Sequence, residues 1–64
     1  MDYETRNNGE LFLTLAELRI DRDTYAAIAW QYLSPFEREF LLDTKQNIAA
    51  IEAILNARGY DTAQ

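Results

Sequence analysis

The segment Ser34-Pro35-Phe36-Glu37 constrains the fold more than any other part of the chain, because it has the form of a helix start. A serine N-cap accepts a backbone hydrogen bond, a proline at the first helical position needs no donor, and a glutamate three residues after the cap completes a capping box. Downstream, Gly59 suits the left-handed conformation that ends helices, and Tyr60 can fold back on Leu55. We therefore predict a helix over residues 35–58, roughly 36 Å long.

This predicted helix carries an apolar stripe along most of its length. At 100° per residue, eight side chains share one broad face: Phe36, Phe40, Leu41, Thr44, Ile48, Ile51, Ile54 and Leu55. A thinner stripe at spacing four consists of Ala49, Ala53 and Ala57. The alanines are either a second packing face or simply good helix formers. The long helix should be the spine of the fold.

A second apolar segment covers residues 10–20. Leu11, Leu15 and Leu18 lie at helical spacing, and Asn7 or Asn8 could cap a helix here. The leucines at 11, 13 and 15 also alternate as in a strand, so the pattern alone is ambiguous. We predict a helix, because Ala16, Glu17, Leu18 and Arg19 are good helix formers and no partner strand is visible elsewhere.

Between these segments, we predict a third helix over residues 22–33. Asp21 and Asp23 can cap it, and the stretch from Tyr25 to Leu33 is apolar on almost every side. A helix of that kind is buried all round, against the other two helices or against a second chain. The sequence thus predicts an all-α, three-helix domain with a tight corner at Ser34-Pro35. We expect one domain over residues 1–64, with residues 1–8 and 61–64 frayed.

The short length of the chain indicates that a partner would help to stabilise its fold. A domain of 64 residues buries only about 60% of the surface of its unfolded chain, so small domains usually rely on disulfides, metals or oligomerisation. Cysteine and histidine are both absent, which excludes disulfides and thiolate or imidazole metal sites. No apolar run reaches the ~20 residues of a membrane span, and no signal peptide is visible. We expect a cytoplasmic protein that oligomerises or binds a partner.

The residues needed for catalysis are scarce. Without histidine or cysteine, and with Lys45 as the single lysine, general acid–base and nucleophilic chemistry have few candidates. Ser34 is the single serine, and its capping role accounts for it. Asp21 and Asp23 resemble the opening of a calcium loop, but the glycine and glutamate that such a loop needs do not follow. We therefore expect no enzyme activity, no cofactor and no metal.

The charge pattern argues against nucleic acid and anionic membranes as partners. The net charge is −5, and the six basic residues are scattered singly, so direct binding to nucleic acid or to an anionic membrane is disfavoured. Five carboxylates fall near the expected corner: Asp21, Asp23, Glu37, Glu39 and Asp43. They either only solubilise the chain, or form an acidic surface like that of a small phage or mobile-element inhibitor that blocks a nucleic-acid-binding protein.

The interaction hypothesis we favour rests on aromatic residues. Tyr25, Trp30 and Tyr32 can supply a large buried area with polar tips, which suits an interface as well as a core. We expect a non-enzymatic protein–protein interaction module, a homodimer or a small subunit of a larger complex. Ala49, Ala53 and Ala57 provide a second candidate surface.

Overall fold

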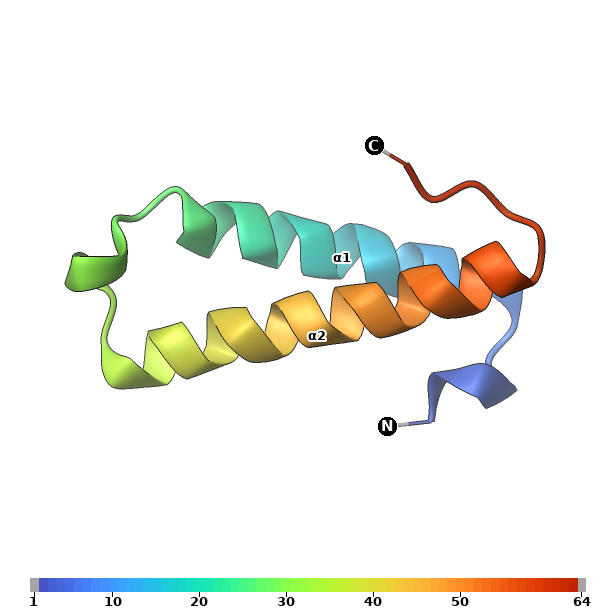
Figure 1. The fold of residues 1–64 in the computed structure, drawn as a ribbon, viewed down its shortest axis with the longest axis horizontal. Helices are drawn as coiled ribbons and strands as arrows, with labels where there is room; N and C mark the ends of the chain where they lie inside the picture. Colours follow the sequence, from blue (N-terminus) through green and yellow to red (C-terminus); the bar gives the residue numbers. More distant parts are fainter. Residues whose placement is uncertain (1, 64) are drawn as a thin grey trace.

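The computed structural model describes residues 2–63, which fold as an antiparallel hairpin of two long helices (Figure 1). Helix α1 spans Asn8–Ala26 and helix α2 spans Pro35–Ala57; short 3-10 helices lie at Tyr3–Thr5 (η1) and Trp30–Tyr32 (η2). No strand occurs among residues 2–63, which removes the strand alternative for residues 10–20. The extents are 38 × 23 × 15 Å, so the molecule is a single layer of helices.

The three-helix prediction was wrong, because residues 22–33 form no separate α-helix. Helix α1 instead runs through Asp21 and Asp23 and ends at Ala26. Neither aspartate caps a helix; the hydroxyl of Thr24 donates to the carbonyl of Ile20 at 2.9 Å inside α1. Extending an existing helix adds one bond per residue, whereas a new helix needs a new nucleus. In addition, a two-helix hairpin has no room to cover a segment that is apolar on every side.

Both helices begin with the side-chain caps that the sequence predicts. At the start of α2, the Glu37 N–H donates to the Ser34 hydroxyl at 3.1 Å, and the Ser34 N–H donates to the Glu37 carboxylate at 3.0 Å. At the start of α1, Asn7 accepts from the N–H of Glu10 at 2.8 Å and donates to its carboxylate at 2.9 Å. The capping box at Ser34 is therefore confirmed, and Asn7 rather than Asn8 caps α1.

The end of α2 also follows the prediction. Gly59 has a φ of +91°, and its N–H donates to the carbonyl of Asn56 at 3.0 Å. The N–H of Tyr60 donates to the carbonyl of Leu55 at 3.0 Å, which completes a Schellman motif. The Tyr60 ring packs edge-on against Phe12, with 5.6 Å between centroids, and so links this turn to α1.

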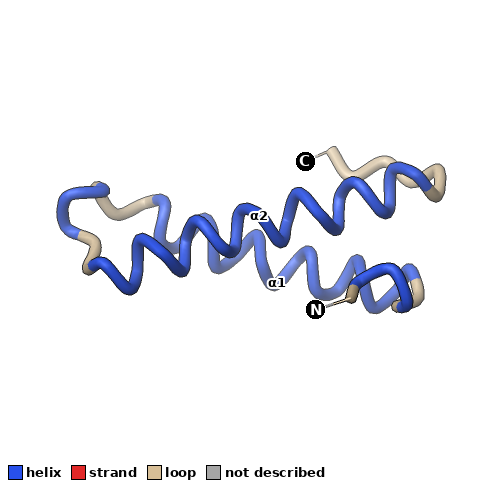
Figure 2. Tube along the Cα trace, turned by 60° about the horizontal axis from the view of Figure 1, so that its bottom comes forward, coloured by secondary structure: helices blue, strands red, loops and turns tan. Residues whose placement is uncertain are grey.

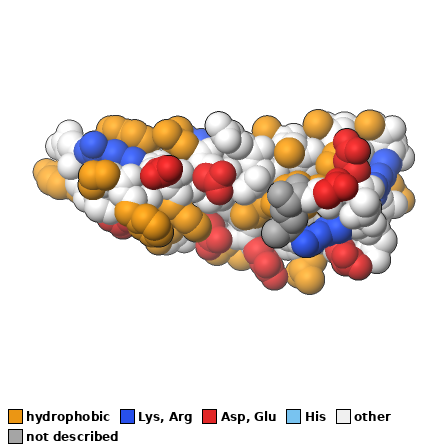
Figure 3. Space-filling model, turned by 90° about the horizontal axis from the view of Figure 1, so that it is seen from below, with side chains coloured by type: hydrophobic (Ala, Val, Ile, Leu, Met, Phe, Trp, Pro, Cys, Tyr) orange, Lys and Arg blue, Asp and Glu red, His pale blue; other side chains and the backbone are white. Residues whose placement is uncertain are grey.

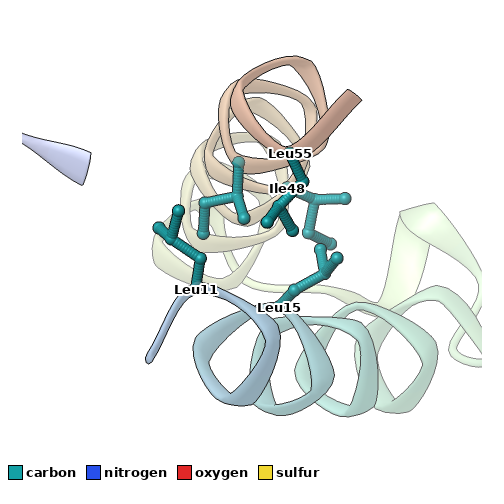
Figure 4. Close-up of a cluster of buried hydrophobic side chains, with 5 residues drawn as sticks. Leu11, Leu15, Ile48 and Leu55 are labelled. Carbon is teal, nitrogen blue, oxygen red and sulfur yellow. The ribbon is translucent and has the colours of Figure 1, made fainter. Parts of the chain in front are cut away.

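The main core lies in the half of the hairpin away from the connecting turn, which we call the distal half. Leu11 and Leu15 of α1 meet Ile48, Ile51 and Leu55 of α2, and all five are buried (Figure 4). Three partly buried side chains flank them: Tyr3, Leu18 and Ile54. Nearer the turn, the buried residues are Leu33, Leu41 and Thr44. The predicted stripes of both helices are thus confirmed at their centres.

Both chain ends lie at the distal half of the hairpin (Figures 1 and 2). The N-terminal η1 contacts α2, and the C-terminal segment contacts Arg19 of α1. The Arg58 guanidinium donates to the carbonyls of Glu4 and Arg6 at 2.8 and 3.0 Å, and to the Asn8 side chain at 2.9 Å. The C-terminal segment is held by Arg19 of α1. Its guanidinium donates to the Glu52 carboxylate at 3.0 Å and also to the backbone carbonyl of Thr62.

These contacts involve both segments that we expected to fray, 1–8 and 61–64. Tyr3–Thr5 form η1, Asn8 already belongs to α1, and Thr62 is buried with its hydroxyl 3.1 Å from the Asn56 side-chain oxygen. Met1 and Gln64 lie outside the described residues. The distal half is therefore closed by long-range polar contacts as well as by its core.

Candidate interaction surface

Large apolar side chains gather in an exposed position around the turn that joins α1 and α2. We call this set the tip surface: Ile28, Trp30, Tyr32, Phe36, Phe40 and Leu42. Figure 3 shows hydrophobic side chains grouped over the turn half of one face, with charged side chains among them and further charged side chains at the distal end. The chain's own ends pack on the distal half, although Leu13 stays exposed there, and the described residues of these ends do not contact the tip surface. This asymmetry singles out the turn half as the candidate functional region.

The two phenylalanines at the start of α2 do not pack as predicted. Phe36 is 78% exposed and Phe40 is 36% exposed, although the sequence places both on the wide apolar face. At 100° per residue, Phe36 points about 100° away from Leu55 and about 120° away from Ile48. Helix α1 ends at Ala26, so it provides little cover for the first turn of α2. Phe40 contacts Tyr25 edge-on, with 5.2 Å between ring centroids, and Phe36 remains open.

The turn itself is held against α2. The Arg38 guanidinium lies 5.4 Å from the centroid of the Trp30 ring, and its Nε donates to the Trp30 carbonyl at 3.0 Å. Within the turn, the N–H of Tyr32 donates to Ala29 at 2.9 Å, and the N–H of Leu33 donates to Trp30 at 3.1 Å. Trp30 is nevertheless 49% exposed and Tyr32 75% exposed. The turn therefore displays its aromatic side chains from a hydrogen-bonded backbone.

A shallow groove of about 440 Å³ runs over the first turns of α2. Its lining combines apolar and polar side chains: Phe36, Phe40, Leu42, Glu39, Asp43 and Gln46. The Asp43 carboxylate accepts a long hydrogen bond of 3.4 Å from Asn47 one turn later. A surface of this kind can bind apolar side chains of a partner, while its carboxylates limit how close another acidic surface can come.

The five carboxylates of the predicted acidic surface have different surroundings. Glu37 belongs to the capping box, where the backbone N–H and then the hydroxyl of Ser34 hold the pKa of its carboxyl below the ordinary value of 4.5. Asp23 forms an ion pair with Arg22 at 2.9 Å, and Asp21 is exposed on α1. Glu39 and Asp43 line the groove. Within residues 2–63, no three acidic side chains lie close enough together to hold a metal ion.

The residues predicted for an apolar interface fall into three places. Tyr25 is half-buried near the end of α1, and Trp30 and Tyr32 are exposed in the turn. Ala49, Ala53 and Ala57 are exposed along the outer side of α2. The prediction omitted Ile28, Phe36, Phe40 and Leu42, which are exposed in the turn and in the first turns of α2. The position of Phe36 at the edge of the apolar stripe was the signal that could have identified it.

Comparisons with known proteins add no family to this picture: no protein-family model, no curated protein and no solved structure matches the chain. Neither α1 nor α2 combines the length and the apolar character needed to cross a bilayer, as judged over the described part of the chain. The fold and the tip surface are therefore the basis for any functional proposal.

Proposed function

We propose that this chain is a non-enzymatic protein–protein interaction module that docks through its tip surface. The observation that supports this function is the concentration of six large, exposed apolar side chains around one turn. Single exposed apolar residues are ordinary on protein surfaces, but a contiguous group of them marks an interaction site. The group includes Trp30 and Tyr32, and tryptophan and tyrosine are enriched among the residues that dominate binding energy.

The energetics favour the turn as an anchor. Fully burying one large apolar side chain contributes about 1.5–3 kcal/mol relative to leaving it exposed. Tyr32 and Phe36 are at least three-quarters exposed, so each can contribute most of that amount on binding. Because Arg38 and the turn hydrogen bonds already hold the backbone at Trp30, less conformational entropy is lost when a partner binds.

The proposal can be tested by affinity capture with matched variants. The tip variant replaces Tyr32 and Phe36 with serine, and the control replaces Leu13 with serine, because Leu13 is 64% exposed on α1 in the distal half. All three side chains lie outside the core cluster, so circular dichroism should report unchanged folding. We expect the wild-type chain and the control to retain the same protein, and the tip variant to lose it. Equal retention by all three chains would refute the proposal.

A further inference from the structure

A fold of this size has few sources of stability. The chain has no cysteine, and no three of its described acidic side chains approach one another as metal ligands. Its core cluster consists of five residues. Domains of this size otherwise gain stability from disulfides, metals or oligomerisation, and the first two are absent from the described residues. Burial against another chain would add to the stability that this small core supplies.

The turn half is the part of the molecule where apolar side chains can be buried against another chain. The chain's own ends cover the distal half through Arg58 and Arg19, whereas the turn half has no such cover. The molecule is one layer of helices about 15 Å thick. Stable helical domains pack two layers around one core, as in a four-helix bundle. A second hairpin placed over the turn half would supply the second layer.

The exposed aromatic side chains of the tip surface provide the area for such a contact. Trp30, Tyr32, Phe36 and Phe40 are 49%, 75%, 78% and 36% exposed. A large aromatic side chain can bury about 150–250 Å², so these four hold on the order of 500 Å² per chain. Ile28 and Leu42 add to it, since they are 41% and 50% exposed. Two copies would bury about 1,000 Å² from the aromatics alone, which is the lower limit of about 1,000 Å² for a biological interface and suits a weak dimer.

We propose that the occupant of the tip surface is a second copy of this chain, so that two hairpins form a two-fold symmetric dimer with their tip surfaces in contact. This inference rests on the proposed function and names its partner. A two-fold interface brings the same patch of both chains together, and an apolar patch is complementary to itself. A second copy is also available wherever the chain accumulates.

The charges give this dimer a distinctive signature. Each chain carries a net charge of −5, and Glu39 and Asp43 line the groove beside Phe36 and Phe40. In a two-fold dimer these carboxylates approach their symmetry mates, so charge opposes an association that apolar contact drives. Salt screens the repulsion and should therefore tighten the dimer. A basic partner protein on the same surface would show the opposite dependence, because salt would weaken its binding.

The test is sedimentation equilibrium of the full chain up to about 100 µM, which populates a dimer with a dissociation constant on the order of micromolar. We expect twice the chain mass of 7.4 kDa. Raising salt from about 0.1 to about 1 M shortens the screening length from roughly 10 Å to roughly 3 Å and should tighten the dimer severalfold. Trp30 is the single tryptophan, so its emission should shift to the red as the dimer dissociates on dilution.

Variants locate the interface. Phe36→Asp places a new charge at the symmetric contact and should weaken the dimer at least tenfold. Leu13→Asp, at a comparably exposed distal site, should leave it unchanged, and Glu39→Gln with Asp43→Asn should strengthen it. A monomer at every salt concentration would overturn the inference, as would salt-weakened association or a dimer that is insensitive to Phe36→Asp. A monomer that still captures another protein through its tip surface would sink this inference and leave the proposed function standing.

Discussion

Replacing Arg58 with lysine separates two roles for a basic residue at the end of α2. A positive charge there favours the negative end of the helix dipole, and lysine keeps that charge. The structure adds a second role, because the Arg58 guanidinium donates to the carbonyls of Glu4 and Arg6 and to the Asn8 side chain at 2.8–3.0 Å. Lysine has no planar fork and cannot satisfy three acceptors in this arrangement. Arg58→Lys should therefore destabilise the fold although the charge is unchanged.

The expected loss follows from the geometry. A hydrogen bond from a charged donor contributes about 1.5–3 kcal/mol when it is sheltered from water. Arg58 is exposed, so solvent reduces each contribution, and we expect a total loss of about 1–2 kcal/mol. A chain of 64 residues has a free energy of unfolding of about 3–10 kcal/mol at 0.05–0.15 kcal/mol per residue. The Tm should fall by about 5–15 °C.

Thermal unfolding followed by circular dichroism at one fixed protein concentration measures this loss. Hydrogen exchange adds a local readout, because the Arg6 N–H that bonds Tyr3 in η1 should exchange faster in Arg58→Lys. Lys45→Gln is the matched control, since Lys45 is another exposed cation of α2, and it should change stability by less than about 0.5 kcal/mol. If Arg58→Lys unfolds at the wild-type temperature while Arg58→Met does not, the dipole alone explains Arg58 and the bridging role is refuted.

Four further predictions concern single positions. Ser34→Ala removes the N-cap of α2 and should lower stability by about 1 kcal/mol in urea unfolding; an unchanged midpoint would contradict the capping role. Gly59→Ala forces a φ of +91° on a residue with a Cβ and should cost about 1–2 kcal/mol, although no atom lies within 4 Å of the new group; equal Tm values would argue against it. Ile51→Ala leaves a cavity at a fully buried site and should cost about 2–5 kcal/mol, enough to leave the chain marginal or unfolded, whereas Ile51→Val should remain folded. For Glu37, the folded-state pKa lies below 4.5, so its contribution is present above that pH and is lost as the pH falls through the lower value. Glu37→Gln should therefore be less stable than wild type at neutral pH, with a difference that shrinks in acid; parallel acid-unfolding curves would exclude this linkage.

Helix α2 could be predicted from the sequence because its limits are encoded locally. Ser34, Pro35 and Glu37 specify its start within four residues, and Gly59 marks its end. The periodicity of the apolar residues then identifies the face that packs on α1, with Ile48, Ile51 and Leu55 at its centre. Such signals do not depend on the rest of the fold, so they survive in the structure.

The end of α1 was mispredicted because its local signals conflict. Asp21 and Asp23 are typical N-cap residues, but Tyr25 lies two turns after Leu18 on the face that Leu11 and Leu15 begin. The structure follows the stripe, since Tyr25 reaches Phe40 across the hairpin. Propensity for capping is a weak preference, and packing against another helix overrides it.

Other features lay outside any local pattern. Arg58 bonds residues 50–54 positions earlier in the chain, and Arg19 bonds residues 33 and 43 positions later. No sequence window contains both partners of such a contact. The tip surface was missed in part for a related reason, because the exposure of Phe36 depends on where α1 stops.

The loss of the third helix strengthens the case for a docking partner. Had residues 22–33 formed a helix packed on the spine, Trp30 and Tyr32 would have had neighbours within the same chain. The turn instead leaves them exposed beside Phe36 at one end of a hairpin, while Arg19 and Arg58 close the other end. The two halves therefore differ in kind: contacts with both chain ends close the distal half, and the turn half leaves its aromatic side chains exposed to solvent.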